Sequence, residues 1–161
     1  MSDLPISVRV AQAVGIFGAL FSAGSMICTS RLVIPAIRQS PTPLLLSQWK
    51  NIYTIGSRTA PKMALITSTA MAYVSYHFCS SSEGKLWALA SVLAISIIPY
   101  TIVVVFPTNK FLEEWHKKEG LGIDRKDVDE KINEWTYKHS IRTYLTLSGG
   151  LIALFAVIRR S

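Results

Sequence analysis

Long stretches of this chain carry almost no charge, and that feature most restricts what it can fold into. Half of the 161 residues are apolar, and the mean hydropathy of +0.33 is high for a soluble domain. The apolar residues gather into four runs, about residues 10–29, 60–78, 86–106 and 144–158. A helix of about 20 apolar residues can cross the hydrocarbon core of a bilayer. The sequence therefore predicts an all-α protein, a four-helix transmembrane bundle that forms one domain over residues 1–161.

The first run could instead be a secretory signal peptide. Its N-terminal flank makes a poor basic leader, the run is long for such a peptide, and no small-residue cleavage site closes it. Small side chains lie one helical turn apart in the pairs Gly18–Ser22 and Ala19–Ala23, a spacing that lets membrane helices approach closely. We therefore predict a packed membrane helix, with a cavity wall or a homo-oligomer contact as the alternative uses of these small residues.

Two connectors with different charge separate the runs. Residues 30–62 hold five basic and no acidic residues, and their Leu44–Ser57 part predicts a short helix lying in the membrane interface. Residues 109–142 hold eight basic and eight acidic residues and predict a helical, charged connector. Four spans would place both termini on one side of the membrane. That side would carry four of the 17 basic residues, and the opposite side would carry the other thirteen. Because cytoplasmic loops are rich in Lys and Arg, we predict cytoplasmic connectors and termini that lie outside or in the lumen. We also expect an endomembrane location, such as the endoplasmic reticulum.

The net charge of +7 could indicate binding to nucleic acid. The basic residues, however, lie between apolar runs rather than on a patterned soluble face, and none of the usual nucleic-acid motifs is present. The lipid bilayer is therefore the predicted partner, because basic juxtamembrane segments are attracted to anionic lipids.

Prolines and cysteines give further local predictions. We expect Pro61 to begin the second span and Pro99 to kink the third. Cys28 and Cys79 would lie near opposite faces of the membrane, farther apart than the ~7 Å between Cα atoms that a disulfide allows. We therefore predict that both thiols are free.

Motifs of soluble catalysis are absent from the sequence, including G-x-S-x-G, a phosphate loop, H-E-x-x-H and C-x-x-C. The three histidines are His77, His116 and His139. Because His77 would lie across the bilayer from His139, three converging histidines or two haem ligands are poorly supported. We predict no metal and no cofactor.

The stretch WTYKHSIR, residues 135–142, joins the charged connector to the last apolar run. In a helix, Trp135, His139 and Arg142 lie on one face. Two interpretations are open, because Trp and Arg gather at membrane boundaries as anchors, whereas a charge close to hydrocarbon often marks a functional site. Four spans would bring further residues to the same membrane face: Pro35, Trp49, Tyr53, Gly56, Thr108 and Asn109. Such a pocket would have aromatic walls, an amide, a neutral base and a fixed cation, which suits a flat, phenolic substrate dissolved in the bilayer.

Three segments carry a resemblance to a known family: QWKNIYTIGSRTAPKMA, IPYTIVVVFPTNKFLEE and EWTYKHSIRTYLTL. The sequence resembles the fungal anthrone oxygenases, small four-helix membrane proteins related to a large group of uncharacterised domains. The resemblance implies that O2 oxidises a polyketide-derived anthrone to an anthraquinone in secondary metabolism, with no recognised metal or flavin. The implied partners are a small hydrophobic aromatic substrate and O2.

The resemblance and the chemistry of anthrones together imply roles for eight residues. His139 would act as the base, Arg142 would stabilise the enolate oxyanion, and Asn109 would donate to the same oxygen or a neighbouring hydroxyl. The expected substrate-binding residues are Trp135, Trp49, Tyr53, Thr108 and Tyr100. Each role has a structural alternative. His139 could bond a backbone carbonyl, Arg142 could bind lipid phosphate or an acidic neighbour, and Asn109 could cap a helix. Trp49 and Tyr53 could be interfacial anchors. The whole protein could also be a non-catalytic membrane helper or a metal- or haem-dependent membrane oxidoreductase.

Overall fold

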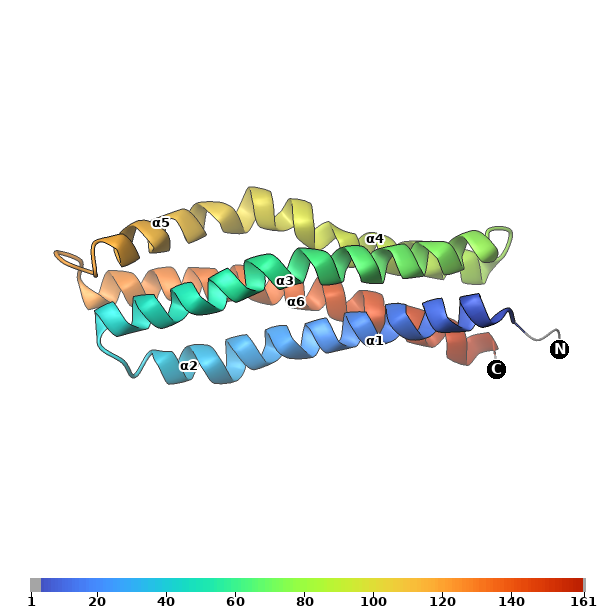
Figure 1. The fold of residues 1–161 in the computed structure, drawn as a ribbon, viewed down its shortest axis with the longest axis horizontal. Coiled ribbons are helices and arrows are strands. Elements are labelled where there is room, and N and C mark those ends of the chain that lie inside the picture. Colours follow the sequence, from blue (N-terminus) through green and yellow to red (C-terminus); the bar gives the residue numbers. More distant parts are fainter. Residues whose placement is uncertain (1–3, 161) are drawn as a thin grey trace.

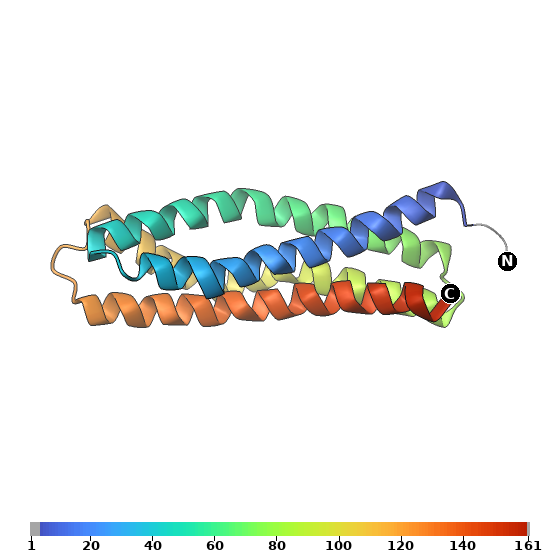
Figure 2. The same ribbon diagram turned by 90° about the horizontal axis from the view of Figure 1, so that it is seen from below.

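The computed structural model describes residues 4–160, which form four long helical rods joined by short turns (Figures 1 and 2). The first rod runs through α1 (Ile6–Cys28), η1 (Thr29–Val33) and α2 (Ile34–Ile37), and the second is α3 (Thr42–His77). The third runs through α4 (Ser82–Tyr100), η2 (Thr101–Val105) and α5 (Phe106–Lys117), and the fourth is α6 (Arg125–Arg160). No strand occurs within residues 4–160. The predicted all-α four-helix bundle is confirmed.

The rods alternate in direction, so that both ends of the described chain lie at one end of the bundle (Figure 1). The turn at residues 78–81 lies at that same end, which we call the terminal end. The turns at residues 38–41 and 118–124 lie at the opposite end, which we call the connector end. The predicted placement of the two termini on one side is therefore present in the fold.

Three of the four rods are long and apolar enough to cross a membrane: Ile6–Ile37, Ser82–Lys117 and Arg125–Arg159. The α3 rod is not among them, since its second half contains polar residues such as Thr67, Ser68 and His77. It nevertheless packs along both α1 and α4. A rod of 36 residues is roughly 54 Å long, whereas the hydrocarbon core is about 30 Å thick. The bundle therefore extends well beyond one hydrocarbon layer, and the threading of four spans stays a prediction.

The predicted interfacial helix is corrected by the structure. Leu44–Ser57 is helical, but it is the first part of the continuous α3 rather than a separate helix on the membrane surface. Its apolar face, which includes Leu46 and Trp49, is buried in a cluster at the connector end of the bundle. Because the bundle itself buries that face, the segment stays in line with the second span. Pro61 likewise lies inside α3 instead of beginning a helix.

Two π-helical turns interrupt the first and third rods, and both contact α6. One of them, η1, comes just before Pro35, and the other, η2, lies between Pro99 and Pro107. Figure 1 shows the third rod bending where α4 passes into α5, as the proline predicted. π-Turns insert one extra residue into a helix and occur often at functional sites.

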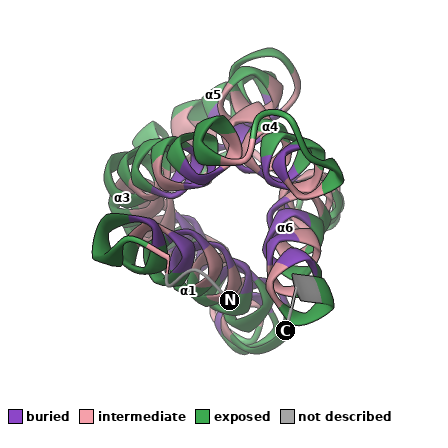
Figure 3. Cartoon of the chain, turned by 90° about the vertical axis from the view of Figure 1, so that its right-hand side faces the viewer, coloured by how far each residue is buried: buried purple, intermediate pink, exposed green. Residues whose placement is uncertain are grey.

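Small residues bring the rods close together in the terminal half of the bundle. A side chain added at Gly18 would meet the Thr67 hydroxyl at 2.5 Å, and one added at Gly150 would meet the Ala19 Cβ at 3.1 Å. The buried residues face inward and the exposed ones outward around the bundle axis (Figure 3). The outward surface includes large apolar side chains such as Phe17 and Phe155, which suit contact with lipid. Helix packing, rather than a cavity wall, accounts for Gly18.

Both cysteines are free, as predicted. Cys28 lies at the end of α1 and Cys79 in the turn at the terminal end, and both are exposed.

Candidate functional site

The predicted aromatic residues form one cluster in the connector half of the bundle. Trp135 stacks on His139 with ring centroids 4.7 Å apart, and Trp49 meets Trp135 edge-on at 6.2 Å. Tyr53 stacks on Trp49 at 5.3 Å. Trp135 also donates a hydrogen bond from its indole nitrogen to Asn109 Oδ1 at 2.9 Å. Three separate parts of the sequence thus meet in this cluster, because α3, α5 and α6 contact one another here.

His139 faces the interior of the bundle and is only 5% exposed. Its Nδ1 lies 3.0 Å from the hydroxyl oxygen of Ser30, which comes from η1. Within residues 4–160, no acidic side chain pairs with this imidazole. The Arg142 guanidinium follows one turn later on the same helix. The imidazole is therefore a buried side chain rather than a surface anchor, and its role as a base stays a prediction.

Arg142 follows His139 by one turn of α6 and reaches η2 of the third rod. One of its terminal nitrogens donates to the Thr101 hydroxyl of η2 at 3.1 Å, whereas its Nε is buried without a hydrogen-bond partner. The Tyr100 hydroxyl and the Trp49 indole nitrogen are likewise buried and unpartnered. Leaving a buried donor unsatisfied costs about 1–3 kcal/mol. Three such donors in one region indicate a place where a polar ligand could supply the missing acceptors.

Thr108 belongs to a polar cluster beside the aromatic one. Its hydroxyl donates to Glu134 at 2.8 Å and accepts a hydrogen bond from Lys138 at 2.8 Å. Glu134 also pairs with Lys131 at 2.7 Å and with Lys138 at 2.6 Å. Because Thr108 is already bonded in this way, its described contacts hold α5 against α6, and its predicted substrate contact stays a prediction.

Tyr53 lies at the edge of the aromatic cluster, next to an ion pair between Lys50 and Glu113. Burial raises the pKa of the Tyr53 hydroxyl, and the Glu113 charge raises it further, while Lys50 and a hydrogen bond with Asn109 act in the opposite direction. The phenol is therefore held neutral, and it completes the set of contacts that fix Asn109 beneath Trp135.

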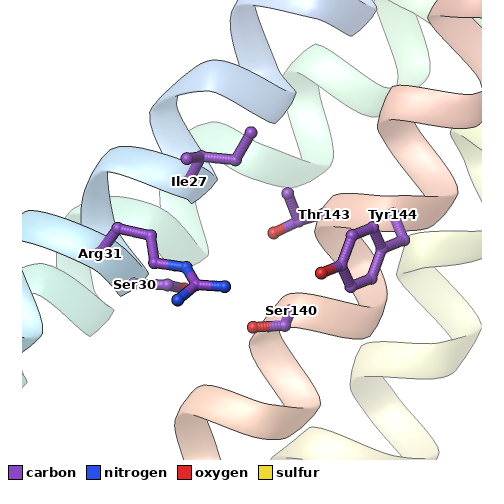
Figure 4. A pocket seen from close by; sticks show the side chains of 6 residues that line it. All are labelled: Ile27, Ser30, Arg31, Ser140, Thr143 and Tyr144. Carbon is purple, nitrogen blue, oxygen red and sulfur yellow. The ribbon is translucent and has the colours of Figure 1, made fainter.

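A pocket of about 170 Å³ lies between the first rod and α6, close to His139 (Figure 4). Its lining residues are Ile27, Ser30, Arg31, Ser140, Thr143 and Tyr144. Ser30 belongs both to this pocket and to the hydrogen bond with His139. None of the eight predicted site residues lines it.

Sequence reasoning missed the residues that η1 and η2 contribute. Ser30 and Thr101 carry no motif of their own, although Thr101 follows the Pro99–Tyr100 pair of the resemblance. Two residues expected at the site lie less deeply: Pro35 is exposed, and Gly56 has open space where a side chain would be. Of the other histidines, His77 is exposed on α3, distant from the site. Among residues 4–160, no group of three or more His, Cys, Asp or Glu side chains could hold a metal ion.

The comparison with known proteins decides the family of this chain. The family model described as anthrone oxygenase matches residues 49–152, a segment that contains all eight predicted site residues. The chain belongs to the anthrone oxygenase family. It is 30% identical to anthrone oxygenase encC of Aspergillus fumigatus over 91% of this chain and 92% of that protein.

Two further relatives also match more than nine tenths of this chain. The chain is 27% identical to an anthrone oxygenase of Claviceps purpurea, over 95% of this chain and 90% of that protein. It is 26% identical to a noranthrone monooxygenase of Aspergillus flavus, over 91% of this chain and 72% of that protein. No solved structure matches the chain.

Proposed function

We propose that this member of the anthrone oxygenase family converts a polyketide-derived anthrone and O2 to the anthraquinone and water, with no cofactor. The observation that carries the proposal is the setting of His139. This imidazole is buried, stacked on Trp135, free of any carboxylate among the described residues and close to a guanidinium. A neutral base beside a cation is what proton abstraction next to a carbonyl system requires.

The first step is removal of a proton from carbon. The methylene of an anthrone is acidified by two aryl rings and by the conjugated carbonyl opposite. The methylene loses one proton, His139 gains one and becomes imidazolium, and the substrate becomes an electron-rich enolate. Arg142, one turn farther along α6, offsets the negative charge that develops on the enolate oxygen. A well-placed donor of this kind contributes about 3–4 kcal/mol to a transition state.

The second step uses the enolate itself as the reductant. The anion transfers one electron to O2, and the resulting radicals combine to form a carbon–oxygen bond. The imidazolium returns its proton to give the hydroperoxide. Loss of the second C–H proton, with cleavage of the O–O bond, then yields the quinone carbonyl and water. The carbon loses four electrons and O2 gains four, so the reaction balances without another oxidant.

The surrounding residues hold the base and the aromatic substrate in place. Asn109 anchors Trp135, and Trp135 supports the imidazole ring. Trp49 and Tyr53 extend this aromatic support around Trp135. We propose that the reaction takes place in an endomembrane, because such a substrate dissolves in lipid, and that the connector end faces the cytoplasm.

Oxygen uptake by the purified protein on an anthrone tests the proposal. We expect His139→Ala to lower kcat by at least about 100-fold, since general base catalysis contributes about 10²–10⁴-fold. His77→Ala is the matched control, because His77 is exposed at the terminal end of α3. Full activity of His139→Ala, with uptake above the rate without protein, would remove the proposed base.

Two other functions make different predictions for the same preparation. A non-catalytic helper would show no turnover by the purified wild-type protein and would tolerate changes at Asn109. A metal- or haem-dependent oxidoreductase would carry a stoichiometric metal or a haem absorption band. Elemental analysis and an absorption spectrum of the active preparation separate these cases.

A further inference from the structure

The pocket between the first rod and α6 has no role in the account so far, yet it adjoins the proposed base. Ser140 directly follows His139 on α6, and Thr143 comes one turn later and donates its hydroxyl to the His139 carbonyl at 3.1 Å. Across the pocket, Ser30 places its hydroxyl oxygen 3.0 Å from His139 Nδ1. A molecule in this pocket would therefore be separated from the imidazole only by the Ser30 hydroxyl.

The polar groups of this pocket differ in whether they are already used. The Ser140 and Thr143 hydroxyls donate to carbonyls of their own helix. By contrast, within residues 4–160 the Arg31 guanidinium and the Tyr144 hydroxyl make no hydrogen bond or ion pair with the protein. Figure 4 shows Arg31 extending from the first rod toward α6, across the pocket. An unused cation and an unused phenol beside apolar surface suit a molecule that is flat, apolar and acidic at its edge.

We propose that the aromatic substrate binds in this pocket, with Arg31 facing its acidic oxygens and the Ser30 hydroxyl passing its proton to His139. This proposal rests on the proposed function, since it names the binding site of that same reaction. In the proton step, the C–H bond of the substrate breaks and its proton moves to Ser30 Oγ. The hydroxyl proton of Ser30 moves to His139 Nδ1 at the same time. The products are the enolate, an unchanged serine and an imidazolium.

The pocket is smaller than most small-molecule sites, so some of its lining side chains must move to admit a substrate. Small-molecule sites measure roughly 300–1,000 Å³, whereas this pocket measures about 170 Å³. Arg31 and Tyr144 are exposed, and no described hydrogen bond holds either side chain in place. We expect rotation of these two side chains to widen the pocket when a substrate binds. A substrate dissolved in the bilayer then enters sideways between two helices, without crossing the aqueous connector end.

A binding measurement tests the pocket independently of turnover. Wild-type protein in nanodiscs of zwitterionic lipid is titrated with a 1,8-dihydroxyanthraquinone, a stable probe shaped like the product, and tryptophan fluorescence is recorded. We expect Ser140→Phe, which fills the pocket, to weaken binding at least about tenfold, a typical effect of losing a central contact. Ser148→Phe is the matched control, because Ser148 is exposed on the same helix, away from the pocket.

Arg31→Ala is expected to weaken binding of the same probe comparably. Arg58→Ala is its control, because Arg58 is exposed on α3.

A double-mutant cycle tests the proton path through Ser30. We expect Ser30→Ala to lower kcat by about 100-fold and Ser30→Thr, which keeps the hydroxyl, to retain most of the activity. Because residues that act as one unit give non-additive losses of activity, adding Ser30→Ala to His139→Ala should lower kcat little further. A full additional loss in the double variant would show that Ser30 acts only on folding or packing.

The remaining outcomes separate the possible failures. Unchanged binding in both Arg31→Ala and Ser140→Phe, or no binding by the wild type, would overturn the pocket assignment. If Arg31→Ala weakens binding only in nanodiscs containing anionic lipid, Arg31 serves lipid phosphate and its proposed role is wrong. If the wild type binds the probe and Ser140→Phe does not, yet no anthrone is oxidised, the pocket stands and the proposed function fails.

Discussion

At the scale of single residues, the site depends on how Trp135 is held. Its indole nitrogen is bonded to Asn109, and its ring lies against both His139 and Trp49. An imidazole between an indole and a serine hydroxyl has little freedom to rotate. This order matters for catalysis, because a base acts efficiently only when it is already aligned with the C–H bond it attacks.

Asn109→Leu tests this support. The change removes the acceptor for a buried N–H, so we expect a loss of about 1–3 kcal/mol in unfolding free energy, together with a lower kcat. The measurements are thermal unfolding in detergent and oxygen uptake. Asn51→Leu is the control, because Asn51 is exposed on α3. Equal melting temperatures for the two variants would show that the Trp135 contact contributes nothing to stability.

At the scale of helices, the close approach of α1 and α3 sets the geometry of the bundle. Gly18 allows this approach, since an added Cβ would lie 2.5 Å from the Thr67 hydroxyl. Gly24 is on the same helix but has nothing within 4 Å of that position. The two glycines therefore form a natural pair for measuring how much tight packing contributes.

We expect Gly18→Val to lower the melting temperature in detergent and to reduce the yield of folded protein. The reason is that overpacking a close helix contact costs about 1–3 kcal/mol. Gly24→Val should leave both quantities nearly unchanged. The packing account would be wrong if the two substitutions had the same effect on the melting temperature.

Helical periodicity was sufficient to predict that Trp135, His139 and Arg142 share one face of a helix. Hydropathy located the apolar runs, but it did not show that helices continue through the connectors. The Leu44–Ser57 segment looks amphipathic whether its apolar face meets lipid head groups or, as observed, the connector half of the bundle. Ser30 was not predictable, because its partner His139 is 109 residues away and a single serine gives no periodic signal.

At the scale of the whole molecule, the two ends of the bundle differ in charge. The connector end carries most of the 17 basic residues, and both termini lie at the other end. From the positive-inside rule we expect the connector end to face the cytoplasm. In this expected orientation, the candidate site lies on the cytoplasmic side of the bilayer.

Glycosylation of engineered acceptor sites tests this orientation. An acceptor sequence inserted in the turn at residues 118–124 should stay unmodified, whereas one fused after the C-terminus should be glycosylated in microsomes. The reason is that the enzyme that glycosylates these acceptors acts in the lumen, so only an acceptor on that side is modified. Modification of the 118–124 insertion would show that the orientation is reversed.

The central claim is that this chain, through His139, catalyses oxidation of an anthrone by O2. The most direct measurement is incubation of the purified protein with an anthrone under ¹⁸O2, followed by mass analysis of the quinone over time. The account predicts one labelled oxygen per quinone, formed well above the rate without protein and lost in His139→Ala. Label appearing no faster with the wild type than without protein, or equally fast with His139→Ala, would contradict it.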